Sequence, residues 1–108
     1  MEIPLNVQVE YSDGLNWQPI GSSEYVLINP TTEEISHLVV KENFPPKTEV
    51  IVPIEWISAS DPEKIRLSCS QSELKKRNRL LKRHLLRKKY RKWWLGTVVI
   101  PTEWDHII

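Results

Sequence analysis

The sequence predicts a mainly β fold, a small antiparallel barrel or sandwich, followed by a long basic α-helix and a C-terminal strand. The first 70 residues contain short apolar or β-branched runs separated by turn residues, and a long run without Gly or Pro follows them. Five strands are expected, at a spacing of roughly 8–12 residues and with no helix between them. They cover residues 5–11, 23–30, 35–41, 50–57 and 64–69.

A long helix is expected over residues 71–93. Ser70 and Glu73 have the spacing of a capping box, in which the hydroxyl and the carboxylate satisfy each other's free backbone amides. No Gly or Pro follows until Gly96, and the Leu, Lys and Arg residues of this run are good helix formers. On a helical wheel one apolar face is formed by Leu74, Leu81 and Leu85.

The C-terminal residues echo an earlier strand. The sequence VIVPIEWI at 50–57 and the sequence VVIPTEWD at 98–105 share Val, Pro, Glu and Trp at equivalent positions. A repeated strand-and-turn unit explains this match, and so do two unrelated strands that both contain Pro. The expected organisation is a β-domain (1–70), a basic helical arm (71–95) and a C-terminal strand segment (96–108). That last segment is either a truncated repeat or a strand swapped between subunits.

Within the β-domain, a strand ends at Asn29-Pro30, and a tight turn leads into ISHLVV (35–40). A loop, VIVPIEWI (50–57) and KIRLSC (64–69) follow in that order. Over residues 5–74 this order resembles the PRC-barrel family, whose small β-barrel occurs in the photosynthetic reaction-centre H subunit, in a ribosome maturation factor and in many short bacterial and archaeal proteins. The resemblance implies a PRC-barrel-like domain that acts as an adaptor or assembly module, often self-associates and has no cofactor. Two features depart from the family pattern: the turn PTTEEI lacks the usual Gly, and a long basic helix replaces a short segment.

The net charge of +1 conceals a strong separation of charge along the chain. Residues 1–73 hold 4 basic and 12 acidic residues, a formal charge of −8. Residues 74–92, called the basic segment below, hold 11 basic residues and no acidic one. In residues 93–108 the Asp and Glu residues are Glu103 and Asp105, and there is no Lys or Arg. Such asymmetry is typical of chains that bind nucleic acid, an anionic membrane or an acidic protein.

Four interpretations of the basic segment remain open. It binds RNA or DNA phosphates, it binds an anionic membrane surface, it folds against the acidic body of its own or a second subunit, or it is a solvated helix without a partner. The first interpretation is favoured, with residues 74–94 as the contact region. The expected phosphate contacts are Lys75, Lys76, Arg77, Arg79, Lys82, Arg83, Arg87, Lys88, Lys89, Arg91 and Lys92. The expected apolar anchors or interface residues are Leu74, Leu81, Leu85, Trp93, Trp94, Trp56 and Trp104.

The predicted function is therefore a non-enzymatic adaptor or assembly module whose basic helix binds an acidic partner. The alternatives are a structural homo-oligomer, such as a homodimer with swapped helix and C-terminal strand, and a peripheral membrane binder. No catalytic residue, metal ligand, cofactor or small-molecule substrate is expected, because the three His residues are scattered and no phosphate-binding loop occurs. The lone Cys69 and the lack of a secretory signal pattern favour the cytoplasm, with a peripheral membrane location as the alternative.

Overall fold

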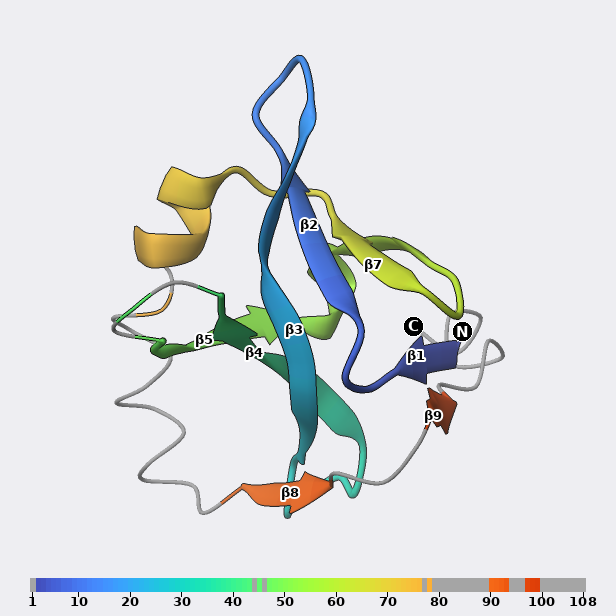
Figure 1. The fold of residues 1–108 in the computed structure, drawn as a ribbon. Helices are drawn as coiled ribbons and strands as arrows, with labels where there is room; N and C mark the ends of the chain where they lie inside the picture. Colours follow the sequence, from blue (N-terminus) through green and yellow to red (C-terminus); the bar gives the residue numbers. More distant parts are fainter. Residues whose placement is uncertain are drawn as a thin grey trace.

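The chain forms one large, strongly twisted sheet with a small second sheet at its side (Figure 1). The computed structural model describes residues 2–43, 45, 47–76, 78, 90–93 and 97–99. The large sheet has the strand order β5-β4-β3-β2-β7-β6, with β8 added to β3, and the small sheet pairs β1 with β9. The strands are β1 (Glu2–Pro4), β2 (Gln8–Ser12), β3 (Trp17–Ile28), β4 (Ile35–Glu42), β5 (Glu49–Pro53), β6 (Ile57–Ser60), β7 (Lys64–Leu67), β8 (Arg91–Trp93) and β9 (Thr97–Val99), and the short 3-10 helix η1 (Ile54–Trp56) joins β5 to β6.

The 12-residue strand β3 organises the sheet because it pairs with different neighbours along its length. Its first half forms an antiparallel ladder with β2, and its second half, from Gly21 to Ile28, pairs with β4. On the side that β2 leaves open, the last three residues of β3 pair with β8, with Leu27 opposite Lys92. An unpaired strand edge exposes N–H and C=O groups that favour a further strand, and β8 satisfies them here.

Close contact between β3 and β4 requires a glycine. A Cβ atom built on Gly21 would lie 1.9 Å from the carbonyl oxygen of Lys41, which is far inside any allowed contact. Gly21 itself is buried and faces Glu42 in the ladder. The glycine therefore permits the crossing of β3 over β4 at this point.

The main core lies on one face of the twisted sheet. It contains buried side chains from nearly every strand of the large sheet, from β1 and from a short α-helix at residues 71–76. They are Ile3, Leu5, Val9, Val26, Leu38, Val40, Val52, Ile57, Ile65, Leu67, Cys69 and Leu74. Alternate residues of β3, β4 and β5 point to the opposite face, as the two-residue period of a strand requires. There Tyr25, Leu27, Val39 and Ile51 form a second apolar cluster.

The mainly β character predicted from the sequence is confirmed, but the predicted closed barrel is wrong, and so is its purely antiparallel pairing, because β2 and β7 run parallel. The described strands form an open sheet with β5 and β6 at its two ends. At β5 the outward N–H of Ile51 donates to the side chain of Asn78, and the C=O of the same residue accepts from it. Pro53 is the next residue of β5 whose backbone groups face away from β4, and it has no N–H with which to bond a further strand. The edge of β5 is thus occupied by a side chain and interrupted by a proline, so it does not pair with another strand.

The predicted long basic helix is also wrong. Within the described residues the only α-helical stretch longer than a single residue covers 71–76, and residues 91–93, which were expected to end the helix, form strand β8. Helix propensity is a weak preference that the open edge of β3 overrides at this point. Residues 77 and 79–89, on which the rest of that prediction falls, lie outside the described residues.

Two further features predicted from the sequence lie within the described residues. The turn between β3 and β4 keeps a left-handed residue without using Gly, because Glu33 adopts a φ of 61° and its N–H donates to the carbonyl of Asn29. In the C-terminal segment, β9 forms a strand that pairs with β1 of the same chain. No helix among the described residues is long and apolar enough to cross a membrane.

Candidate functional site

The basic segment begins in a short capped helix. The N–H of Ser70 donates to the Glu73 carboxylate over 3.4 Å, and the N–H of Glu73 donates to the Ser70 hydroxyl over 3.3 Å. These are the reciprocal bonds expected from the sequence. Leu74 is only 2% exposed and belongs to the main core, which fixes this helix on the sheet. Lys75 and Lys76 consequently stand on its solvent side, and both are exposed.

Asn78 ties the start of the basic segment to the edge of the sheet. Its side chain is 9% exposed, its Oδ1 accepts from the N–H of Ile51 at 2.6 Å, and its Nδ2 donates to the Ile51 carbonyl at 2.9 Å. The same Nδ2 donates to the Leu74 carbonyl at 2.8 Å. A carboxamide has one acceptor oxygen and two donor hydrogens, and in Asn78 the oxygen and the NH₂ group are all engaged by these three bonds. Asn78 is not among the site residues predicted from the sequence, although it is the only carboxamide within the run of basic residues.

Tyr90 ties the end of the basic segment to the second apolar cluster of the same sheet. Its ring packs against the cluster formed by Tyr25, Leu27, Val39 and Ile51. It also lies edge-on to the His37 ring with the ring centroids 5.9 Å apart, and its hydroxyl accepts a hydrogen bond from Asn29 Nδ2 over 3.3 Å. Asn78 is therefore attached to the edge of β5, and Tyr90 is attached to the second cluster and to Asn29; residues 79–89 lie between these two anchors in the sequence.

Strand β8 presents the last cations of the basic segment. Arg91 is exposed and forms an ion pair with Glu33 in the turn between β3 and β4. The ammonium of Lys92 lies 4.9 Å from the centroid of the Tyr25 ring, a cation–π distance. Trp93 remains 47% exposed although its backbone is paired with β3. Arg91, Lys92 and Trp93 thus follow one another on a strand whose backbone is held by the sheet, with Lys92 on the opposite face from Arg91 and Trp93.

Four of the eleven predicted phosphate contacts can be placed: Lys75, Lys76, Arg91 and Lys92 are exposed, at the two ends of the basic segment. Among ion pairs between described residues, Lys75 and Lys76 take part in none. Of the predicted apolar anchors, Leu74 is in the core of its own chain, Trp56 is half-buried against that core, and Trp93 is exposed. The remaining predicted residues lie outside the described part of the chain: Arg77, Arg79, Lys82, Arg83, Arg87, Lys88, Lys89, Leu81, Leu85, Trp94 and Trp104.

The Glu24 carboxylate lies close enough to Lys92 for their charges to interact, and Glu49 lies beside Glu24. Burial of the Glu24 carboxyl group raises its pKa, and the nearby carboxylate of Glu49 raises it further, whereas Lys41 and Lys92 act in the opposite direction. Burial, followed by a hydrogen bond to Glu49, also raises the pKa of the Tyr25 hydroxyl. Lys92 therefore stands where the sheet carries negative charge, which favours its position against the second cluster.

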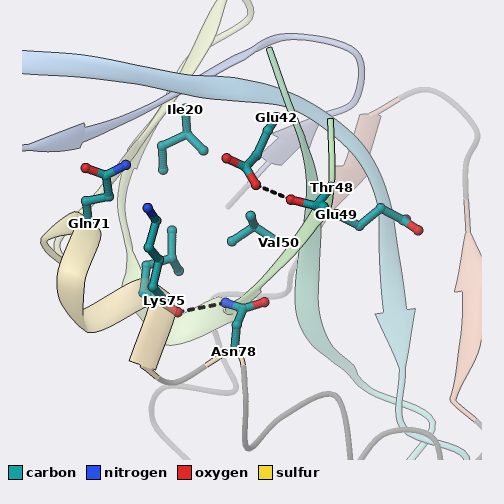
Figure 2. Close-up of a pocket in the computed structure, with 9 residues that line it drawn as sticks. Ile20, Glu42, Thr48, Glu49, Val50, Gln71, Lys75 and Asn78 are labelled. Atoms are coloured by element: carbon teal, nitrogen blue, oxygen red, sulfur yellow. Dashed lines mark hydrogen bonds between the residues drawn. The ribbon is translucent and has the colours of Figure 1, made fainter. Parts of the chain in front are cut away.

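A pocket that was not predicted from the sequence lies beside the short helix (Figure 2). It has a volume of about 310 Å³ and is lined by residues from four separate parts of the chain: Ile20, Glu42, Thr48, Glu49, Val50, Gln71, Leu74, Lys75 and Asn78. The ammonium of Lys75 and the carboxylate of Glu42 point into it from opposite walls. No sequence signal identifies such a site, because its residues are brought together only by the packing of the helix against β3 and β5.

The described residues contain no group of three or more His, Cys, Asp or Glu that could hold a metal ion. Cys69 is 4% exposed, and burial raises the pKa of its thiol to about 11. A buried thiol with a raised pKa is a poor nucleophile. No protein-family model matches the chain, and neither the curated proteins nor the solved structures contain a significantly similar one. The resemblance to PRC-barrel proteins therefore stays a prediction.

Proposed function

We propose that this chain is a non-enzymatic binding module that takes an acidic polymer, RNA or DNA, on its basic segment. The observation that carries the proposal is that both ends of the segment are attached to the sheet. Asn78 is bound to the backbone of Ile51, and Tyr90 packs against the cluster that contains Ile51. Six of the eleven basic residues, namely Arg79, Lys82, Arg83, Arg87, Lys88 and Lys89, lie in sequence between these two anchors.

Attachment at both ends supports binding for an energetic reason. A cationic chain that is free at one end loses more conformational freedom when it binds than a chain whose ends are already fixed. Phosphate neutralisation by several Lys and Arg residues releases counterions, and this gives affinity that depends strongly on salt and little on base sequence. The tethered segment concentrates such residues on a body of formal charge −8 (residues 1–73). The negative charge of residues 1–73 repels phosphates from the rest of the surface, so a nucleic acid is expected to bind at the basic segment.

Among the residues that the structure describes, the distribution of apolar side chains favours nucleic acid over a membrane surface. A helix that lies in a membrane interface needs an apolar face to insert. Leu74 is turned into the protein core, and among the described residues Trp93 is the exposed large apolar side chain next to the basic segment. The other two such side chains, Leu15 and Trp17, belong to the β2–β3 hairpin, whose tip lies at the opposite end of the molecule from β8 (Figure 1).

The test is a fluorescence anisotropy titration of a labelled oligonucleotide over a salt series. The double variant Lys88→Gln/Lys89→Gln should bind more weakly and lower the slope of log K against log [salt] by roughly 1.4–1.8, since each phosphate contact contributes about 0.7–0.9. The matched control Lys41→Gln/Lys47→Gln makes the same change in net charge outside the segment and should leave the slope nearly unchanged. Absence of binding at about 50 mM salt, where counterion release is strong, refutes the proposal. Binding to anionic vesicles without binding to the oligonucleotide replaces it with the membrane interpretation.

A further inference from the structure

The pocket beside the short helix has two unlike parts. Its inner wall is apolar and is formed by the half-buried side chains of Ile20 and Val50 together with the buried Leu74. Its rim carries polar groups on both sides: Lys75 and Gln71 on the helix, and Glu42 at the end of β4 (Figure 2). An apolar pocket with a few convergent polar groups is the usual form of a small-molecule site, and about 310 Å³ is within the range of such sites.

The polar groups of the rim are held in place by neighbours. The Glu42 carboxylate accepts a hydrogen bond from the Thr48 hydroxyl, and the backbone N–H of Glu42 donates to the Thr48 carbonyl at 3.0 Å. On the helix side, the Gln71 side-chain oxygen accepts from the Tyr11 hydroxyl over 3.2 Å. Asn78, at the base of the pocket, is bound to Ile51 and Leu74. The walls are therefore positioned before any ligand arrives.

The charges of Lys75 and Glu42 face each other across the pocket without pairing. Both point into the hollow, and no ion pair between described residues includes either of them. A ligand of a single charge would satisfy one of these groups and desolvate the other, which is unfavourable. A ligand with both charges would form a charge-assisted hydrogen bond at each wall.

We propose that this pocket binds a small zwitterion with an apolar substituent, that is, a free α-amino acid with a branched aliphatic side chain. Its carboxylate lies on the Lys75 ammonium, its ammonium group lies on the Glu42 carboxylate, and its side chain covers Ile20 and Val50. The inference is independent of nucleic-acid binding, because Glu42, Ile20 and Val50 are not part of the basic segment. Lys75 is shared between the two sites.

The binding test uses the full chain and three ligands that differ by one charged group. L-Leucine carries both charges, 3-methylbutylamine lacks the carboxylate, and 4-methylpentanoate lacks the ammonium group. Calorimetry at low salt should give saturable binding of leucine with a dissociation constant of about 1 mM or lower, and binding at least about tenfold weaker for each analogue. In NMR spectra the methyl signals of Ile20 and Val50 should shift with leucine.

Variants of the two walls complete the test. Lys75→Gln and Glu42→Gln should each weaken leucine binding by about tenfold or more, which corresponds to the loss of one charge-assisted hydrogen bond. Lys76→Gln on the same helix and Glu55→Gln on η1 are the matched controls and should bind leucine like the wild type. No saturable binding of leucine, equal affinity for all three ligands, or unchanged binding by both wall variants overturns the proposal. Glu42→Gln should keep full oligonucleotide binding, so failure of this inference is distinguishable from failure of the proposed function.

Discussion

The clearest quantitative test of the architecture is the replacement of Asn78 by Ala. The side chain makes three hydrogen bonds, to both backbone groups of Ile51 and to the Leu74 carbonyl, and it is only 9% exposed. Its removal leaves the N–H and C=O of Ile51 without these partners at a buried edge, and each unsatisfied group costs about 1–3 kcal/mol. Water can reach part of this edge and bond to the freed groups. The expected decrease in the free energy of unfolding is therefore about 2–4 kcal/mol. This is a large share of the roughly 5–15 kcal/mol that stabilises a typical domain.

Urea denaturation followed by Trp fluorescence measures this change in the free energy of unfolding. Lys76→Ala, on the exposed side of the same helix, is the control and should change the free energy by less than about 0.5 kcal/mol. Hydrogen exchange at the Ile51 amide gives a local readout and should accelerate only in Asn78→Ala. The variant should also weaken oligonucleotide binding without altering the salt slope, since no charge is removed. A loss of stability below about 0.5 kcal/mol with unchanged Ile51 exchange would refute the assignment of Asn78 as the anchor.

Three further predictions follow from single residues. Gly21→Ala should destabilise the chain by about 2–4 kcal/mol in the same urea assay, because its Cβ would meet the Lys41 carbonyl at 1.9 Å; a change under about 1 kcal/mol would contradict the close crossing of β3 and β4. Glu24→Gln should increase stability at neutral pH. The pKa of Glu24 is raised in the folded state, so the native chain binds more protons and wild-type stability falls as pH rises above the unfolded value of 4.5. Urea titrations from pH 4 to pH 8 should show a smaller decrease in the free energy of unfolding for the variant than for the wild type. The same pH dependence in both proteins would contradict the raised pKa of Glu24. Cys69, whose thiol pKa burial raises to about 11, should not react with an aromatic disulfide reagent at about pH 8 until urea unfolds the chain; rapid reaction of the native protein would contradict its burial.

The strand pattern of the first 70 residues was predictable because alternation and turn residues are local signals. The expected runs at 35–41, 50–57 and 64–69 correspond closely to β4, to β5 with η1, and to β7. The sequence pattern did not predict β1 or β6, and it placed only the second half of β3 in a strand. Each of these errors has a local cause. Short strands such as Glu2–Pro4 have too few residues for a period, and Pro19 with Gly21 in the first half of β3 indicates a turn rather than a strand.

The open form of the sheet was not predictable, because it depends on contacts between residues far apart in the sequence. The edge of β5 is occupied by the side chain of Asn78, 27 residues from its partner Ile51. In the sequence, Asn78 is simply a moderate helix former within a basic run. Its role appears only when the short helix packs Leu74 into the core and brings the carboxamide to the strand. The pocket residues are gathered by the same packing step.

The two ends of the basic segment show why charge and secondary structure need to be considered separately. Eleven cations without a compensating carboxylate repel one another in a single helix, and like charges three or four residues apart oppose its formation. In the described part of the chain each end of the segment is held instead by a specific partner. Asn78 bonds to the β5 edge, and β8 completes the β3 edge, with Arg91 beside Glu33 and Lys92 over Tyr25. The cost of collecting so many positive charges is thus offset by contacts with the sheet at both ends, and it falls further whenever phosphates bind between them. On this reasoning, weakening an anchor and lowering the phosphate affinity are linked effects, and a variant such as Asn78→Ala should show both.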